Sequence, residues 1–213
     1  MFSIGTPHKR AAGATTGEAP TGSLYAAMHD TRNAIHARLE GEEATLELGR
    51  IIGTRGAPGL VLALEGDLGC GKTTLVRGIG EGLGIEGGVA SPTYTLMQSH
   101  AGGRLPLAHF DSWMEGREKA LLADGADEFL QSDGIAVVEW ASRVEDWLPR
   151  DRVAVRLHHE TLQSRRVEIA FLGDVAPSQG HLVEALRAAY PPAPGQDPRL
   201  SSPRTGANSP ESG

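Results

Sequence analysis

The sequence predicts an α/β fold, a three-layer sandwich in which helices cover a mostly parallel central sheet. Two short, continuous apolar runs at residues 60–64 and 135–138 are typical of strands buried on both faces of a parallel sheet. Helical patterns at residues 44–52 and 73–83 lie before and after the first of these runs. Strands interleaved with helices indicate this sandwich architecture.

The remaining elements follow in chain order. Apolar residues at 46, 48, 51 and 52 support the helix over 44–52. A further strand is expected at residues 107–110, between the helix over 73–83 and the apolar run at 135–138. Residues 153–157 and 167–171 alternate apolar with other residues, which predicts two strands near a sheet edge, antiparallel to each other. The antiparallel part of the sheet is therefore expected near the C-terminal end of the regular patterning.

Composition divides the chain into three parts. Residues 1–40 form an N-terminal extension, where Tyr25, Met28, Ile35 and Leu39 fit one amphipathic helix over 24–39. Residues 41–190 carry the regular patterning and are expected to form one domain. Residues 191–213 are rich in Pro, Ser and Gly and almost without apolar residues, so we expect a disordered tail that buries too little surface to offset its ordering entropy.

Charge and cysteine content limit the functional classes. The formal net charge of −7 argues against direct binding of DNA or RNA through a basic surface. The single cysteine, Cys70, excludes an internal disulfide framework and fits a reducing compartment. No apolar run approaches the roughly 18 residues that span a bilayer, and the N-terminus lacks the apolar core of a secretory signal. We therefore expect a cytoplasmic protein with no membrane association.

A complete phosphate-binding motif follows the first buried strand. Residues 66–73 match G-x-x-x-x-G-K-[ST] and precede a predicted helix, which is the context that the motif requires. Glycines let the backbone point successive N–H groups at phosphate oxygens, and the helix N-terminus adds its positive dipole end. Lys72 is expected to reach the β- and γ-phosphates, and the Thr73 hydroxyl to bind Mg²⁺. The motif predicts a P-loop NTPase-type protein that binds ATP with Mg²⁺ and hydrolyses it.

Magnesium–nucleotide chemistry also needs a carboxylate, usually at the end of a neighbouring buried strand. Glu139 and Asp111 both follow predicted strands, and spacing leaves open whether each is a nucleotide-site residue or a plain surface acid. Trp140 is more simply a core residue, and Cys70 more simply a small side chain that fits its loop than a redox-sensitive thiol. The segment from Ser91 to Thr95 has the position of a switch loop but also of an ordinary Pro turn.

Residues 158–160, His-His-Glu, suggest a metal site only superficially. They lie between two predicted strands and lack further spaced ligands, so we expect a solvated turn there.

Several of these motifs together resemble one family, the bacterial tRNA threonylcarbamoyladenosine biosynthesis ATPase TsaE (older name YjeE). The resemblance covers about residues 41–173 and rests on five segments in order. These are residues 42–49 (Glu-Glu-Ala-Thr-Leu-Glu-Leu-Gly), residues 66–74 (Gly-Asp-Leu-Gly-Cys-Gly-Lys-Thr-Thr), residues 91–96 (Ser-Pro-Thr-Tyr-Thr-Leu), residues 109–111 (His-Phe-Asp) and residues 138–140 (Val-Glu-Trp). The Ser-Pro-Thr-Tyr-Thr-Leu segment and the Glu-Trp pair are far more specific than the P-loop alone.

The resemblance implies roles for individual residues. Lys72, Asp111 and Glu139 would be catalytic, with Thr73 and Glu139 binding Mg²⁺ and Asp111 positioning the attacking water or sensing the γ-phosphate. Ser91, Thr93 and Thr95 would belong to the switch segment. The implied nucleotide-binding residues are Glu42, Gly66, Asp67, Leu68, Gly69, Cys70, Gly71, Lys72, Thr73, Thr74, Asp111, Trp140 and Arg165, with Arg166 as an alternative to Arg165 in a slightly different register.

The chain departs from the family pattern directly after Asp111. The family usually continues with Leu-Tyr-Arg, whereas this chain has Ser112-Trp113-Met114. The aromatic residue is retained as Trp113, but Met114 replaces the arginine. The neighbouring Arg117 could take the place of that arginine.

The implied function is support of the threonylcarbamoyl modification on the adenosine beside the tRNA anticodon. The protein would use ATP hydrolysis, weak alone and stimulated by a TsaB–TsaD-type transferase complex, to reset that complex, and would meet tRNA only indirectly through it. Two alternatives remain open: a small-molecule P-loop kinase, and a nucleotide-gated binding module with negligible hydrolysis. An acidic rather than basic segment at 116–133 counts against the Arg-rich lid of a kinase.

Overall fold

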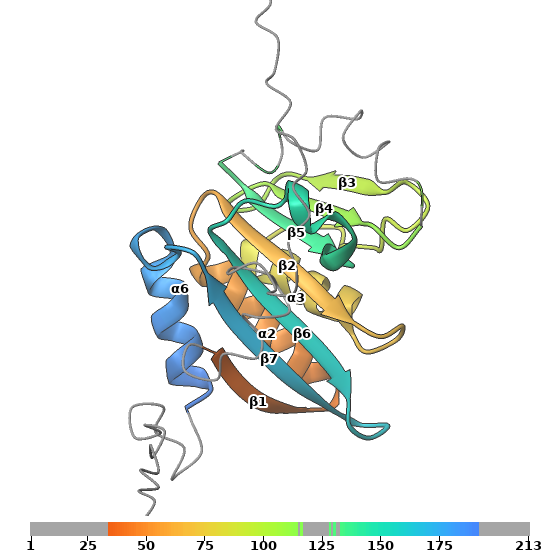
Figure 1. The fold of residues 1–213 in the computed structure, drawn as a ribbon, viewed down its shortest axis with the longest axis vertical. Coiled ribbons are helices and arrows are strands. Elements are labelled where there is room, and N and C mark those ends of the chain that lie inside the picture. Colours follow the sequence, from red (N-terminus) through yellow and green to blue (C-terminus); the bar gives the residue numbers. More distant parts are fainter. Residues whose placement is uncertain (1–33, 115, 117–127, 129, 131–132, 192–213) are drawn as a thin grey trace, which may run out of the picture.

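The computed structural model describes residues 34–114, 116, 128, 130 and 133–191. Helices and strands alternate along most of this span (Figure 1). Their order is β1 (Ala34–Glu40), α2 (Gly41–Arg55), β2 (Leu60–Gly66), α3 (Lys72–Leu83), β3 (Met97–His100), β4 (Leu107–Asp111), β5 (Ile135–Glu139), the 3₁₀ helix η1 (Ala141–Trp147), β6 (Arg152–His159), β7 (Ser164–Leu172) and α6 (Ala176–Ala189).

The strands form one seven-stranded sheet in the order β1-β7-β6-β2-β5-β4-β3. The four central strands β6, β2, β5 and β4 are parallel, whereas β1, β7 and β3 are antiparallel to their neighbours. The predicted α/β fold with a mostly parallel centre is confirmed, as is the antiparallel pairing of the two C-terminal strands. Because the central strands are parallel, the carboxyl ends of β2, β4 and β5 meet at one edge of the sheet.

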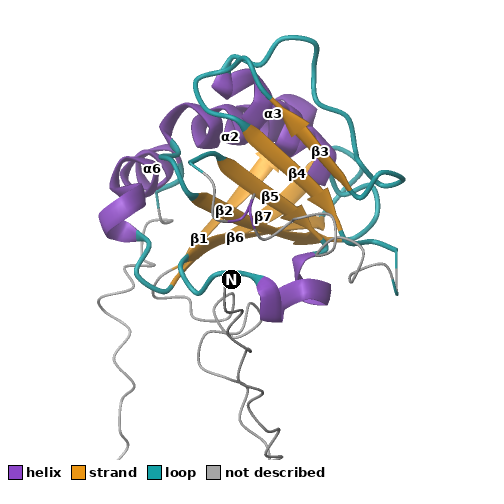
Figure 2. Ribbon diagram, turned by 90° about the horizontal axis from the view of Figure 1, so that it is seen from above, coloured by secondary structure: helices purple, strands orange, loops and turns teal. Residues whose placement is uncertain are grey.

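Helices α2, α3 and α6 cover one face of the sheet, as Figure 2 shows. The larger apolar cluster lies between them and alternate residues of the strands, including Leu62, Leu64 and Val137. α2 and α3 approach so closely that a Cβ at Gly49 would overlap the backbone oxygen of Leu75. This contact fixes α3, and with it the loop between β2 and α3, against the rest of the domain.

The opposite face carries a second, smaller apolar cluster. It contains small strand residues such as Ala63 and Ala136 together with Ala141, Val144 and Leu148 from η1 and the segment after it. Alternation along β5 and β4 therefore sends odd-numbered residues toward α3 and even-numbered residues toward η1. None of the helices in the described part of the chain has the length and hydropathy needed to cross a membrane.

The expected helix over 24–39 is wrong for residues 34–39, which belong to strand β1 and pair with β7. Ile35 and Leu39 are both buried. A spacing of four residues places two side chains on the same side of a strand as well as of a helix, so their spacing alone did not separate the two. Residues 24–33, Arg117 and residues 192–213 of the tail expected at 191–213 lie outside the described residues.

Three further elements have no counterpart in the sequence-based expectations. Strand β3 follows the Ser91–Thr95 segment and pairs with β4, η1 follows Trp140, and α6 packs on the helical face. The predicted elements at 44–52, 60–64, 73–83, 107–110, 135–138, 153–157 and 167–171 are all present, each longer by one to several residues.

Candidate functional site

The motif at residues 66–73 connects β2 to α3 at the carboxyl edge of the sheet. Gly71, at the N-cap of α3, has φ 109°, and Gly69 has φ 76°, a region that residues with a Cβ rarely adopt. Gly66 is constrained by space as well, because a Cβ there would overlap the backbone oxygen of Leu157 and lie 2.7 Å from Cys70 Sγ. The loop conformation therefore depends on glycine at these positions.

Lys72 is buried and held by the loop that precedes it. Its Nζ donates to the backbone oxygens of Gly66 at 2.7 Å and Asp67 at 2.9 Å. The same ammonium group lies 4.0 Å from the ring centroid of Trp140. Carbonyl dipoles and the aromatic face both stabilise a cation, so the positive charge of Lys72 is kept at the mouth of the loop.

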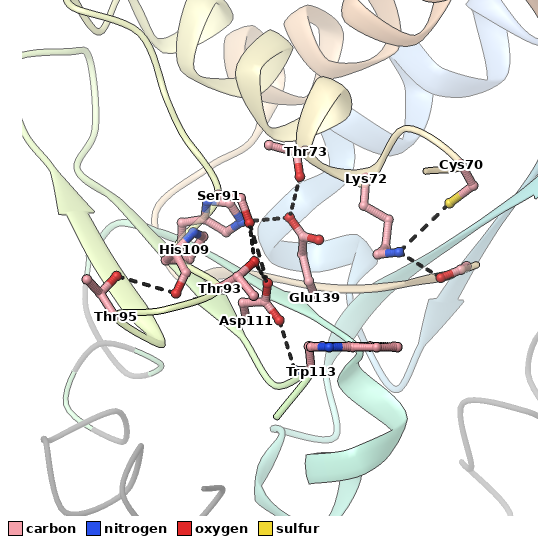
Figure 3. A network of polar contacts seen from close by, with 12 residues as sticks. Cys70, Lys72, Thr73, Ser91, Thr93, Thr95, His109, Asp111, Trp113 and Glu139 are labelled. Atoms are coloured by element: carbon pink, nitrogen blue, oxygen red, sulfur yellow. Dashed lines mark hydrogen bonds and ion pairs between the residues drawn. The ribbon is translucent and has the colours of Figure 1, made fainter. Parts of the chain in front are cut away.

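Glu139 lies beneath the first turn of α3, with Lys72 on one side and the Ser91–Thr93–Asp111 group on the other (Figure 3). Thr73 Oγ1 donates to Glu139 Oε1 at 3.3 Å. His109 Nε2 lies 2.9 Å from the same oxygen. Glu139 is 3% exposed and His109 is fully buried, so this carboxylate depends on protein donors rather than bulk water.

Asp111 connects two loops. Its Oδ2 accepts a hydrogen bond from Thr93 Oγ1 at 2.6 Å, and Ser91 Oγ lies at 3.5 Å from the same atom. Its Oδ1 accepts from the backbone N–H of Trp113 at 2.8 Å. Thr95, predicted with the same segment, donates instead to the backbone oxygen of Pro92. The structure thus places Ser91 and Thr93 on the buried carboxylate, but not Thr95.

Two non-glycine residues in the described part of the chain have positive φ, and both flank this site. Leu96 (φ 66°) ends the Ser-Pro-Thr-Tyr-Thr-Leu segment, and Trp140 (φ 58°) follows Glu139. Such backbone conformations cost about 1–3 kcal/mol each and cluster at functional sites. The ring of Trp140 packs against that of Trp113, with centroids 4.5 Å apart, and Arg143 donates to the Trp113 backbone oxygen at 2.6 Å.

A small cavity of about 130 Å³ adjoins the loop and is lined by Glu42, Thr45, Gly69, Gly71, Thr74 and Arg165. Arg165 Nε donates to the backbone oxygen of Cys70 at 3.4 Å. Arg166, the alternative in the sequence, points to Glu168 instead, at 3.6 Å. The geometry therefore favours Arg165 as the basic residue beside the P-loop.

The side chains at the variable positions of the motif, Asp67, Leu68 and Cys70, are either exposed or buried in the core. Asp67 and Leu68 are exposed, and their backbone oxygens, rather than their side chains, contact the rest of the site. The Cys70 side chain is buried, and burial raises the pKa of its thiol, which opposes formation of a reactive thiolate.

The solvated turn expected at 158–160 is only partly correct. His158 and His159 are the last residues of β6, and His159 Nε2 lies 3.4 Å from the backbone oxygen of Leu68 in the P-loop. The pairing of β6 with β2 brings the end of β6 to this loop, a long-range contact that the local pattern does not encode.

Three residues that contact or line the site had no role predicted from the sequence: His109, Thr45 and Arg143. The signal for His109 was its spacing of two from Asp111, because residues 109 and 111 of one strand share a face.

The donor set at Glu139 suits a hard divalent cation. A threonine hydroxyl and a carboxylate offer oxygen ligands, the type that Mg²⁺ prefers. In the described ranges, no three His, Cys, Asp or Glu side chains are grouped as a metal site. A Mg²⁺ ion at Thr73 and Glu139 would therefore take further ligands from phosphate oxygens and water, as is usual for this ion.

Comparison with known proteins gives consistent matches. The model of the family described as threonylcarbamoyl adenosine biosynthesis protein TsaE matches residues 39–167. The tRNA threonylcarbamoyladenosine biosynthesis protein TsaE of Bacillus subtilis is 37% identical over 138 residues, covering 64% of this chain and 85% of the relative. The protein of the same description from Nostoc is 38% identical over 136 residues, covering 62% and 82%. The crystal structure of Bacillus subtilis YdiB aligns with a TM-score of 0.60 and 29% identity, over 73% of this chain and 96% of that one.

Proposed function

Because this chain belongs to the TsaE family, we propose that it is an Mg-ATP-binding and ATP-hydrolysing accessory protein in the threonylcarbamoyl modification of tRNA. Family membership supports a role in tRNA threonylcarbamoyladenosine biosynthesis. The nucleotide chemistry rests on the site itself. The observation that carries it is the meeting of Lys72, Thr73 and Glu139 at one loop, with Thr73 and Glu139 in hydrogen-bond contact.

In this proposal, different residues of the chain carry out separate parts of ATP binding and hydrolysis. The loop amides and Lys72 neutralise phosphate charge, which is the main form of catalysis available for phosphoryl transfer. Thr73 and Glu139 would hold Mg²⁺, which when bound would offset the negative charge that develops on the phosphate. Asp111, buried beside Thr93, either orients the attacking water or senses the γ-phosphate. Glu42, Thr74 and Arg165 line the small cavity beside the loop and would contact the nucleotide from there.

The partner in this proposal is a TsaB–TsaD-type transferase complex, which the protein resets by hydrolysing ATP. The chain carries a net charge of −7, so contact with tRNA through that complex, rather than directly, fits its electrostatics.

The test is Mg-ATP hydrolysis by the purified protein, alone and with the TsaB–TsaD complex. Lys72→Ala should lower turnover by about 10²-fold or more, because a preorganised charge at the transferring phosphate is lost. Arg150→Ala is the matched control, since it removes the same charge from an exposed residue just before the amino end of β6, at the opposite edge of the sheet. Unchanged ATP turnover in Lys72→Ala would show that Lys72 does not stabilise phosphate charge during hydrolysis.

One second candidate has an observation in its favour: a nucleotide-gated binding module with negligible hydrolysis. Met114 stands where the family has arginine, and the Asp111 carboxylate is engaged by Thr93 and the Trp113 backbone. Partner affinity that changes with nucleotide, without measurable turnover, would favour this candidate. ADP formation that depends on an added small acceptor would instead point to a kinase.

A further inference from the structure

His109 is a polar residue buried in an apolar part of the core. It lies in the middle of β4, on the face that packs against α3, and is fully buried. The neighbouring residues on this face are Leu107 in its own strand and Ile135 and Val137 in β5. An apolar side chain would fill this position without desolvating an imidazole, so stability alone does not account for a histidine here.

The two ring nitrogens of His109 have different surroundings. Nε2 lies 2.9 Å from Glu139 Oε1. Nδ1 is buried and has no hydrogen-bond partner among the described residues. A proton on Nδ1 would be an unsatisfied buried donor, whereas a proton on Nε2 is donated to a carboxylate, so the contact favours a proton on Nε2.

Sheet register explains why this donor meets Glu139. β4 and β5 are parallel neighbours, with His109 beside Val137 and Asp111 beside Glu139. Residues 109 and 139 therefore lie on the same face, with His109 two residues further from the carboxyl edge. The imidazole spans this distance from within the sheet, while Thr73 approaches the same carboxylate from α3.

Both side-chain hydrogen bonds of Glu139 in the described structure end on Oε1. Two fixed donors on one oxygen restrict the rotation of the carboxylate about its terminal bond. They also leave Oε2 for a metal ion or a metal-bound water. Histidines and carboxylates that orient a metal-binding group in this way typically change metal affinity by about 10–100-fold when replaced.

We propose that His109 is a positioning residue that holds the Glu139 carboxylate in the orientation needed for Mg²⁺ by donating its Nε2–H to Oε1. This inference rests on the proposed Mg²⁺-nucleotide function and assigns to it a residue that touches neither the nucleotide nor the metal. His109 acts through Glu139 alone, so its effect should appear in the metal dependence of nucleotide binding rather than in nucleotide binding as such.

The test compares His109→Phe, which keeps a buried ring but loses the donor, with His109→Gln, whose amide N–H can take the place of Nε2–H. The measured quantity is the ratio of ATP dissociation constants without and with Mg²⁺, using a fluorescent ATP analogue. A second readout is direct Mn²⁺ binding to the ATP-analogue complex by electron paramagnetic resonance. His100→Phe serves as control, because His100 lies in the adjacent strand β3 and its Nε2 is also buried without a partner.

We expect His109→Phe to weaken Mn²⁺ binding by about 10-fold or more, with nearly unchanged affinity for metal-free nucleotide, and His109→Gln to recover most of the loss. His100→Phe should match the wild type. Equal Mn²⁺ affinity in His109→Phe and wild type would overturn the proposal. So would a loss that is the same with and without metal, or a glutamine variant no better than phenylalanine, since either result indicates a packing role.

Failure of the proposed function has a different signature. If the wild type binds nucleotide with no dependence on Mg²⁺ or Mn²⁺, Thr73 and Glu139 do not bind a metal ion, and the proposed role of His109 is wrong as well. If the wild type depends on metal and His109→Phe keeps that dependence, only the role of His109 is lost. Nitrogen-15 NMR of the imidazole provides a check without nucleotide, because the proposal requires the Nε2–H form.

Discussion

Replacing Gly66 by alanine should destabilise the protein far more than the same change at Gly69, although both glycines belong to the P-loop motif. At Gly66 the backbone has φ 138° and the added Cβ would overlap the Leu157 backbone oxygen and press on Cys70 Sγ. At Gly69 the φ is 76°, but the nearest atom to the added Cβ is His159 Nε2 at 3.9 Å. One site has both conformational strain and a clash, and the other has strain alone.

The magnitudes follow from these two terms. An unfavourable backbone region costs about 1–3 kcal/mol and overpacking a further 1–3 kcal/mol, so Gly66→Ala should lower the unfolding free energy by about 2–6 kcal/mol. Gly69→Ala should cost about 1–2 kcal/mol, the penalty for a left-handed alanine. With an m-value of about 2 kcal/mol/M in urea, the Gly66→Ala midpoint falls by about 1–3 M.

Urea unfolding monitored by tryptophan fluorescence measures both midpoints. The clash at Gly66 is with β6, so the strain also displaces the loop whose carbonyls hold Lys72. ATP affinity should therefore fall more in Gly66→Ala than in Gly69→Ala. Equal urea midpoints for the two variants would refute the reasoning, because the overlap with Leu157 would then not lower the unfolding free energy.

Two more predictions concern the interior of the site. Thr93→Val should lower the unfolding free energy by about 1.5–3 kcal/mol, because the buried Asp111 carboxylate loses a hydrogen-bond donor. Thr95→Val is the control and should lower it by less in the same urea titration, because the Thr95 hydroxyl donates to the backbone oxygen of Pro92. Because burial raises the pKa of the Cys70 thiol above its ordinary value of 9.0, the native state keeps this proton to higher pH than the unfolded state. The unfolding free energy should then fall as pH rises above that value, and Cys70→Ala should reduce this slope in urea titrations between about pH 8 and 10; an identical slope would contradict the assignment to Cys70.

Much of the fold could be predicted because strands buried on both faces of a parallel sheet have continuous runs of apolar residues in the sequence. Residues 60–64 and 135–138 are such runs, and both are central strands. β1 was missed because its two buried residues, Ile35 and Leu39, are four apart, a spacing shared by helices and strands. β3 carries the residues Met-Gln-Ser-His and is mostly exposed or half-buried, so no apolar pattern marks it; its pairing with β4 defines it.

The site shows the same division between local and long-range information. The P-loop residues are consecutive, so their motif places them together before any fold is known. Asp111 and Glu139 could be named as strand-end carboxylates, but their adjacency depends on the parallel pairing of β4 with β5. Arg165 could not be separated from Arg166 by sequence. Consecutive residues of β7 point to opposite faces of the sheet, and only the fold shows that the face of Arg165 is the one beside the P-loop.

The contacts of Asp111 bear on how this site would respond to a bound phosphate. One oxygen of this carboxylate accepts from Thr93 and the other from the Trp113 backbone, and the Trp113 ring packs on Trp140, the ring that lies beneath Lys72. Asp111 cannot turn toward a metal ion or a water without lengthening at least one of these two hydrogen bonds. Its movement therefore acts on the Ser91–Thr95 segment and on the tryptophan pair together. Leu96 ends the segment that contains Thr93, and Trp140 is the ring on which Trp113 packs, so the two strained non-glycine backbones of the described residues adjoin both groups that Asp111 holds.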